Sequence, residues 1–355
     1  MKKIVQQLRI FALLSLMFFI ATEHQVASAQ QAPSGVTKTL TIASFGGYLD
    51  TVMKEIFKPF EAKHAVAIRW VPAASAENVT KLAAARGSAE YDLVLTDSIS
   101  YWVGVKQNLF AKLDPTIVTA YQDLYPQARL PGVDAATIGF YYAGLFYLPE
   151  EFKKRGWAPP QKWADLFRPE FCRHVGFMHP NVSYGLHAYL MLGGGEPARF
   201  NEAVGMLQKV KNCITVLEPS APKMEEKIQL GEYLVGINGN IRVIPLARRN
   251  VPIAFVFPED GVILGGGVIA VSRSSANLQL SQEFVNWLIS PFAQQILMEK
   301  AFYTPTNKNV IVSDELVKLG VANQAMLKKV VSVDADVMEA QRRNWIRAVE
   351  RAVAP

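Results

Sequence analysis

Short β-branched runs alternate with longer segments of helical period through most of this chain. This alternation is typical of an α/β protein with largely parallel sheets. The predicted strands are residues 39–45, 66–71, 91–96, 138–147, 175–178, 214–217, 234–238, 253–257 and 262–271. The predicted helices between them are residues 49–63, 76–86, 184–192, 200–211, 224–231 and 241–249.

The chain after Ser272 has the pattern of helices alone. We predict helices over residues 278–289, 292–300 and 335–352. Pro291 falls at the first turn of the second of these helices, where proline is tolerated because that N–H has no intrahelical partner.

The N-terminus has the three parts of an export signal. Basic residues near the start precede an apolar run at 10–21 and an A-x-A site that ends at Ala29. We therefore predict a signal peptide over 1–29, cleaved after Ala29, and a disordered leader over 30–37. The apolar run is shorter than the roughly 18 to 20 residues of a membrane span, and no cysteine follows the cleavage site as a lipoprotein would require. These features predict release into the periplasm.

Removal of the signal leaves about 325 residues, more than one hydrophobic core usually organises. We therefore expect two lobes. The full chain carries 37 basic and 31 acidic residues, and the basic ones are scattered singly or in pairs. Without a basic stripe, nucleic-acid binding is not expected.

The two cysteines of the chain are Cys172 and Cys213. In an oxidising compartment they could pair, and the loop of about 40 residues between them would add a few kcal/mol by restricting the unfolded chain. The alternative is two small buried thiols. The separation of their Cα atoms decides between the two, and it cannot be read from the sequence.

Seven segments form a series that runs through nearly the whole mature chain. They are LTIASFGGYLD, YDLVLTDS, WVGVKQNLFAKLD, KWADLFRPEF, YLVGINGNIRV, IAFVFPEDGVILGGGVIAV and EFVNWLISPFAQQILMEKAFYTPTNKNV. In order and spacing, the series resembles the periplasmic spermidine/putrescine-binding proteins and their wider type II solute-binding relatives. The resemblance implies two α/β lobes, each a mostly parallel sheet flanked by helices, with a ligand cleft between them. By analogy, lobe 1 comprises 38–139 and 265–305, and lobe 2 comprises 140–264 and 306–355.

The resemblance also implies a function. Proteins of this type are the substrate-binding receptors of ABC transporters, which close on a small-molecule ligand by a hinge motion and deliver it to a membrane permease. It implies no cofactor and no catalysed reaction, and we expect a monomer. In open α/β sheets, ligands lie beyond the carboxyl ends of strands, where helix N-termini offer free N–H groups.

The turns around the predicted strand ends contain the candidate ligand-binding residues. They are Ser44, Phe45, Gly46, Gly47, Tyr48, Asp97, Ser98, Asn181, Ser183, Tyr184, Asn238, Asn240, Arg242, Leu264, Gly265 and Gly266. The resemblance implies that Phe45 and Tyr48 stack against the ligand. Arg242 could clamp a carboxylate or phosphate with two parallel hydrogen bonds.

Each of these assignments has a structural alternative. Phe45 would otherwise be a core residue at a strand end, and the two glycines after it would serve only the turn. Asp97 and Ser183 suit helix N-caps as well as ligand contacts. Arg242 would otherwise be a solvated surface residue.

The chain departs from the polyamine-binding pattern at two places where that family has carboxylates. Asn240 stands at one of them, and Leu264 and Gly266 stand at the other. A desolvated ammonium group without a counter-charge costs several kcal/mol. The sequence therefore favours a small anionic or zwitterionic organic solute, with a polyamine as the alternative ligand.

Three other functions have less support from the sequence. Ferric-ion binding in related receptors uses adjacent tyrosines, but Tyr141 and Tyr142 are neighbours in a predicted strand and so point to opposite faces. An enzyme would need a motif such as G-x-S-x-G, H-E-x-x-H or paired C-x-x-C, and none is present. His174 and His179 bracket a strand without an evident third zinc ligand. A sensing module that docks on a membrane receptor is not distinguished from an uptake receptor by sequence.

Overall fold

The computed structural model describes residues 38–45, 49–85, 88, 90–132 and 134–354. The predicted signal peptide, the predicted leader and three candidate residues, Gly46, Gly47 and Tyr48, lie outside the described residues.

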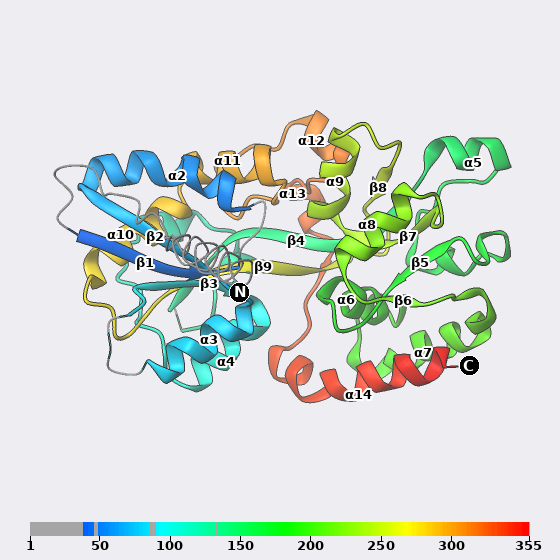
Figure 1. The fold of residues 1–355 in the computed structure, drawn as a ribbon, viewed down its shortest axis with the longest axis horizontal. Coiled ribbons are helices and arrows are strands. Elements are labelled where there is room, and N and C mark those ends of the chain that lie inside the picture. Colours follow the sequence, from blue (N-terminus) through cyan, green and yellow to red (C-terminus); the bar gives the residue numbers. More distant parts are fainter. Residues whose placement is uncertain (1–37, 46–48, 86–87, 89, 133, 355) are drawn as a thin grey trace, which may run out of the picture. The chain divides into compact units, whose positions relative to one another are not determined.

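The described chain alternates strands and helices, as predicted (Figure 1). The strands are β1 (Lys38–Ser44), β2 (Val66–Pro72), β3 (Leu93–Asp97), β4 (Ala135–Tyr147), β5 (Val175–Met178), β6 (Leu217–Glu218), β7 (Val235–Gly239), β8 (Ala254–Val256), β9 (Val262–Val271) and β10 (Val330–Val331). The helices are α2 (Leu49–His64), α3 (Ser75–Ala84), α4 (Ser98–Lys106), α5 (Pro149–Arg155), α6 (Ser183–Leu192), α7 (Phe200–Lys209), α8 (Ala221–Gln229), α9 (Asn240–Arg248), α10 (Leu278–Leu288), α11 (Pro291–Ala301), α12 (Asp314–Leu319), α13 (Gln324–Leu327) and α14 (Ala335–Val353). Within the described part of the chain, no helix has the length and apolar character needed to cross a membrane.

The strands form one series of hydrogen-bonded neighbours, in the order β2-β1-β3-β9-β4-β7-β5-β6. Pairing is parallel toward both ends of this series, where β1 pairs with β2 and β3, and β5 pairs with β6 and β7. In the middle it is antiparallel, because β9 pairs with β3 and β4, and β4 pairs with β7. The predicted parallel pairing therefore holds for the outer strands, and the long strands β4 and β9 are the exception.

Strand β4 connects two sets of strands. Its residues 135–142 pair with β9, and its residues 143–147 pair with β7. Figure 1 shows β4 and β9 side by side, running from the set with β1 and β3 toward the set with β5 and β7. The predicted lobe boundaries after 139 and before 265 fall inside these two strands, and the division into lobes stays a prediction.

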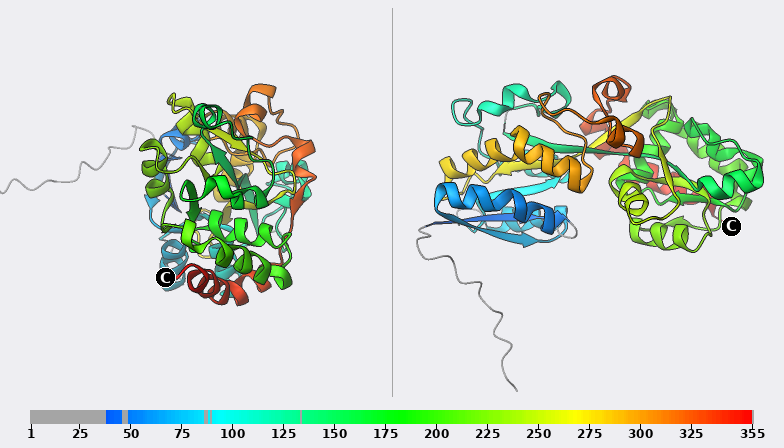
Figure 2. Two further views of the ribbon diagram at one scale, coloured as in Figure 1. Left: turned by 90° about the vertical axis from the view of Figure 1, so that its right-hand side faces the viewer. Right: turned by 90° about the horizontal axis from the view of Figure 1, so that it is seen from above.

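The apolar spacing of α2 explains how this helix packs. Leu49, Met53, Ile56 and Phe60 recur at intervals of three or four residues, and all four are buried. An apolar stripe with this period places one face of a helix against the core. Phe60 packs edge-on against Phe284 of α10, with ring centroids 5.0 Å apart. Figure 2 shows α2 beside α10 and α11, which it contacts.

Besides helix α5, which was not predicted, two regions differ from the predicted elements. The predicted strand over 214–217 is reduced to β6, because Lys211–Cys213 form a 3-10 turn. The chain after Ser272 is not all helix, because Val330–Val331 pair in parallel with β9. Two adjacent β-branched residues suit a strand, and they outweigh the helical pattern around them.

The two cysteines form a disulfide in the structure. The Cα atoms of Cys172 and Cys213 are 4.7 Å apart. Beside them, the backbone N–H of Arg173 donates to the carbonyl of Cys213 at 3.2 Å. Of the two alternatives for these residues, the structure therefore has the paired form.

Candidate ligand pocket

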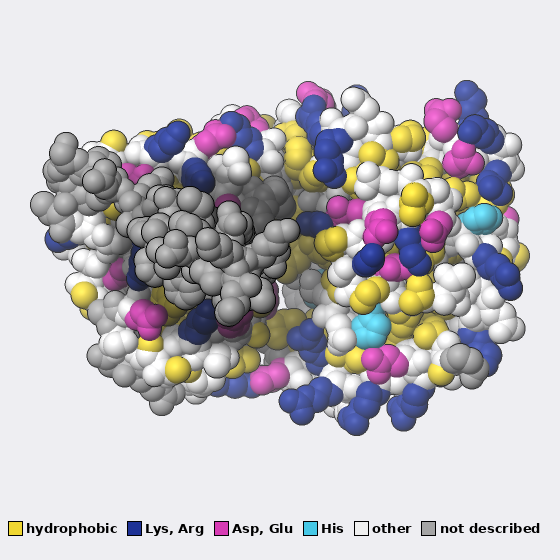
Figure 3. All heavy atoms as spheres, viewed as in Figure 1, with side chains coloured by type: hydrophobic (Ala, Val, Ile, Leu, Met, Phe, Trp, Pro, Cys, Tyr) yellow, Lys and Arg dark blue, Asp and Glu magenta, His cyan; other side chains and the backbone are white. Residues whose placement is uncertain are grey.

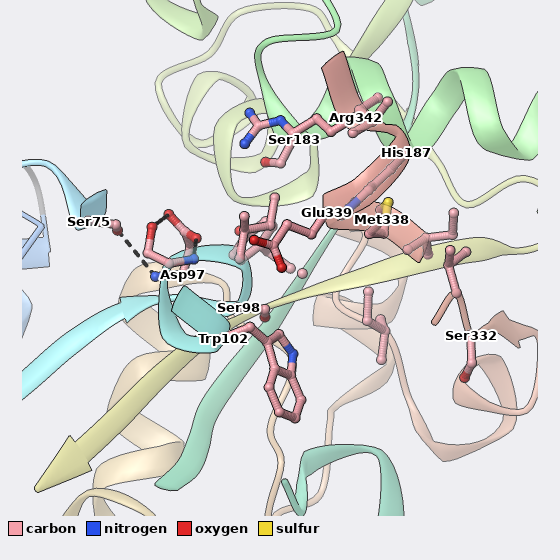
Figure 4. A pocket seen from close by; sticks show the side chains of 18 of the residues that line it. Ser75, Asp97, Ser98, Trp102, Ser183, His187, Ser332, Met338, Glu339 and Arg342 are labelled. Atoms are coloured by element: carbon pink, nitrogen blue, oxygen red, sulfur yellow. Dashed lines mark hydrogen bonds between the residues drawn. The ribbon is translucent and has the colours of Figure 1, made fainter. Parts of the chain in front are cut away.

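A cavity of about 540 Å³ opens where several strand-to-helix turns meet. Its walls include the first residues of α3, α4 and α6, part of β9, and the segment from β10 to α14 (Figure 4). A volume of this size suits a small molecule. Six residues predicted from the sequence line the cavity: Asp97, Ser98, Asn181, Ser183, Leu264 and Gly265.

Asp97 is the N-cap of α4. Its Oδ1 accepts a hydrogen bond from the backbone N–H of Ser100 at 2.8 Å, and its Oδ2 accepts one from the Ser100 hydroxyl at 3.3 Å. The N–H of Asp97 donates to the Ser75 hydroxyl, at the start of α3, at 3.2 Å. The structure thus shows the capping role of Asp97, and a ligand contact by the same carboxylate stays a prediction.

Helices α3 and α6 begin at the cavity without a side-chain cap. Ala74 precedes α3 and Val182 precedes α6, and neither has a side chain that accepts a hydrogen bond. Asn181 and Ser183 lie at the start of α6, where the Asn181 N–H donates to His179 Nδ1 at 3.1 Å. Because the first N–H groups of a helix carry partial positive charge, these two helix ends favour negatively charged oxygen atoms.

Tyr141 of β4 lies on the cavity wall near both α4 and α6. Burial raises the pKa of its hydroxyl, and the negative charge of Asp97 adds to the rise, whereas a hydrogen bond with Ser183 opposes it. The hydroxyl therefore stays protonated at neutral pH and can donate a hydrogen bond to a ligand. Its ring stands edge-on to the buried ring of Tyr184, with centroids 5.7 Å apart.

Arg342 and His187 line the same cavity, although neither was predicted. Arg342 lies on α14, and its Nη2 donates to the carbonyl of Asn181 at 3.0 Å. His187 lies on α6 and is 6% exposed. Within the described residues, Arg342 Nε and His187 Nδ1 are buried and have no hydrogen-bond partner. The spacing of one helical turn between Ser183 and His187 is a sequence signal that points to His187.

The surroundings of His187 keep its ring neutral. Burial lowers the pKa of the imidazole to about 4, and the positive charge of Arg342 contributes to the shift. In Figure 4 the Arg342 side chain passes beside Ser183, and the His187 ring lies at the edge of the same cavity. At neutral pH the ring therefore offers one N–H donor and one acceptor nitrogen.

Comparison of the chain with known proteins identifies its family. Residues 55–324, more than half of the chain, match the bacterial extracellular solute-binding proteins. The chain belongs to this family. Its members are extracellular solute-binding proteins of bacteria.

Solved structures of solute-binding proteins share the fold of this family member. A putative extracellular solute-binding protein from Bordetella parapertussis gives a TM-score of 0.77 at 19% identity, over 89% of this chain and 99% of that chain. An ABC transporter substrate-binding protein from Bradyrhizobium japonicum gives a TM-score of 0.75 at 21% identity, over 88% of this chain and 99% of that chain. These likenesses confirm the predicted type II periplasmic binding protein fold.

A curated relative is the spermidine/putrescine-binding periplasmic protein 1 of Haemophilus influenzae. It is 24% identical over 151 residues, which are 41% of this chain and 41% of the relative. The chain therefore matches less than half the length of that protein.

Arg242 does not line the cavity of this solute-binding protein. Its guanidinium pairs with Glu225 of α8, with an Nη2–Oε1 distance of 2.6 Å. Arg242 follows Asn240, the first residue of α9, by two positions, which is a rotation of about 200° around the helix. Its side chain is thereby turned from the strand end toward α8. The structure therefore does not bring the predicted anion clamp to the cavity.

The Asn240 side chain is buried and hydrogen-bonds two backbone groups inside the fold. It does not line the cavity. Its Oδ1 accepts from the N–H of Tyr142, and its Nδ2 donates to the carbonyl of Phe302, both at 3.1 Å. Nearby, Asn238 is also fully buried, and its Oδ1 accepts from the Gly239 N–H at 2.8 Å. Packing explains the asparagine at position 240, so the missing carboxylate there carries no information about the charge of the ligand.

Four other predicted contacts do not line the cavity. Ser44 is buried, and its hydroxyl donates to the carbonyl of Phe45 at 3.0 Å. Phe45 is half-buried against the core, as its structural alternative predicted. Tyr184 is buried, and the carbonyl of Gly266 accepts from the Ser98 hydroxyl at 3.5 Å.

Replacing Asn240 with aspartate should destabilise the protein by about 2 kcal/mol, because a carboxylate has no N–H to offer the Phe302 carbonyl. The free energy of unfolding, measured with urea, checks this. Asn212→Asp, at an exposed position, is the control. A gain of putrescine binding in Asn240→Asp would contradict a purely structural role of this residue.

The adjacent tyrosines point in different directions, as the strand pattern predicted. The hydroxyl of the buried Tyr142 donates to the Gly320 carbonyl at 2.5 Å, whereas Tyr141 reaches the cavity. The two phenol groups therefore do not meet at one site. Across the residues that the structure describes, no group of three or more His, Cys, Asp or Glu side chains is arranged to hold a metal ion.

Proposed function

We propose that this protein is the periplasmic substrate-binding receptor of an ABC transporter. It captures a small anionic or zwitterionic organic solute by hinge closure and delivers the solute to a membrane permease. The observation that carries the proposal is the cavity, whose walls combine the end of β3 and the turn after β5 with residues of β9 and α14. A ligand there would contact elements from both sets of strands that β4 connects, so hinge closure would be coupled to binding.

The charges around the cavity support an anionic group on the ligand. Arg342 has no carboxylate partner among the described residues, and the uncapped ends of α3 and α6 add partial positive charge. The acidic side chains of the wall are already engaged. Asp97 caps α4, and Glu339 pairs with Lys106 of α4.

A polyamine receptor is the second candidate, because the relative from Haemophilus influenzae is named for spermidine and putrescine. The ammonium groups of such a ligand would need Asp97 and Glu339 to exchange their present partners. In either case we expect a monomer without a cofactor and without catalytic turnover. The ligand contacts that we retain from the sequence are Asp97, Ser98, Asn181, Ser183, Leu264 and Gly265.

A thermal-shift screen tests this proposal. The protein would be unfolded, refolded without carried-over ligand, and mixed with organic acids, amino acids, phosphonates, polyamines or ferric ion. A ligand at 100 times its Kd adds about 2.7 kcal/mol of stability, which raises the Tm by several degrees. We expect an acid or a zwitterion to raise the Tm. A shift with polyamines alone would favour the second candidate, and no shift with any compound would contradict the receptor proposal.

A further inference from the structure

We propose that Arg342 and His187 form an oxyanion subsite of this cavity, where they bind an oxygen of a carboxylate or phosphoryl group. This inference rests on the proposed receptor function. It adds the place at which the anionic end of the solute binds and the side chains that select it.

Two buried nitrogen atoms at this position lack partners. Within the described residues, neither Arg342 Nε nor His187 Nδ1 has a hydrogen bond, although both side chains line the cavity. Buried polar groups are almost always hydrogen-bonded, because leaving one unpaired is unfavourable. Both side chains lie at the cavity, so a small change of their rotamers would turn these nitrogen atoms toward a ligand oxygen or a water molecule.

The charge of Arg342 decides between these two partners. Among the described residues its guanidinium bonds to the Asn181 carbonyl and to no carboxylate. This bond holds the guanidinium just before the first turn of α6, whose uncapped N–H groups add partial positive charge. A guanidinium presents several N–H groups in one plane, an arrangement that matches carboxylate and phosphate oxygens. An anion is therefore favoured over water.

His187 adds a hydrogen bond to this subsite without adding charge. The ring lies within the second turn of α6 and is 6% exposed. Burial and the neighbouring Arg342 hold the pKa of the imidazole at about 4, so the ring is neutral at physiological pH. The subsite thus carries one full positive charge. That suits a group with a single negative charge, such as a carboxylate or a singly protonated phosphoryl group.

The same helix offers a matched control for Arg342. Arg343 is its neighbour on α14 and is exposed. Figure 3 shows further basic side chains along the lower edge of this face, over α14. Replacing Arg343 therefore removes the same charge from the same helix without changing the cavity wall.

The test is an NMR titration of the His187 ring in the refolded, ligand-free mature protein. Sodium acetate and inorganic phosphate are the probes, and His187→Gln identifies the His187 signal by its loss. We expect at least one anion to shift this signal saturably in the wild type and in Arg343→Gln. Its affinity should be at least tenfold weaker in Arg342→Gln and intermediate in Arg342→Lys. The two probes distinguish a carboxylate from a phosphoryl site.

The subsite would be wrong if neither anion shifted the His187 signal saturably, or if the Arg342 variants bound as tightly as the wild type. Melting curves check that Arg342→Gln is folded. If it is not, the anion affinity of Arg342→Lys is compared with that of the wild type instead. The receptor proposal is judged separately by the thermal-shift screen. Putrescine binding that is equal in the wild type and Arg342→Gln would keep the receptor and reject the subsite. If an anion shifted the His187 signal only when Arg342 was present, and no compound raised the Tm in the screen, the subsite would stand and the receptor proposal would be rejected.

Discussion

Replacing both Cys172 and Cys213 with serine should lower the free energy of unfolding by about 4 kcal/mol. The disulfide joins positions 41 residues apart, and closing a loop of that length reduces the entropy of the unfolded chain by this amount. Cys172 is exposed and Cys213 is half-buried, so serine at these positions loses little native packing. The effect is therefore expected to act mainly on the unfolded state.

Urea unfolding of the wild type and the double variant measures this difference. A reducing agent serves as the control, because it should destabilise the wild type and leave the double variant unchanged. Equal stability of the two proteins under oxidising conditions would show that the disulfide contributes nothing to the free energy of unfolding.

The pH dependence of stability should be weaker in His187→Leu than in the wild type. Burial lowers the pKa of His187 from 6.5 to about 4 in the folded state, with a further contribution from Arg342. Between these two values the unfolded chain binds more protons than the folded one, so stability increases with pH. The stabilisation is fully present above pH 6.5 and is lost as the pH falls toward 4.

Between pH 7 and pH 4.5, this one histidine should account for about 2 kcal/mol of lost stability. Urea unfolding of both proteins at the two pH values measures it, and the quantity compared is the loss in the wild type minus the loss in the variant. An identical loss in the two proteins would mean that the ring is protonated without cost in the folded state.

A minor part of the cavity wall could be predicted from local sequence patterns. Asp97, Ser98, Asn181 and Ser183 were expected at strand-to-helix turns, and all four line the cavity. Periodicity shows where a strand ends and a helix begins, and in α/β folds the residues at such points gather at one edge of the sheet. Asn240 satisfied the same pattern, yet its side chain is used by Tyr142 and Phe302.

The direction of side chains beyond these turns depends on long-range packing. Arg342 reaches the cavity because α14 packs on α7, where Trp345 stacks on Phe200 with ring centroids 5.0 Å apart. Its partner, the carbonyl of Asn181, is 161 residues away in the chain. No local pattern contains that contact.

By itself, the sequence determined the α/β fold, most of the strands and helices, and the turns at the starts of α4 and α6 that line the cavity, because these depend on the spacing of neighbouring residues. The tertiary structure alone decided that the cysteines pair and that Arg342, rather than Arg242, stands at the cavity. Both outcomes depend on which distant elements meet. A single sequence does not encode that in any local spacing, because the register of one helix against another follows from the packing of the whole core.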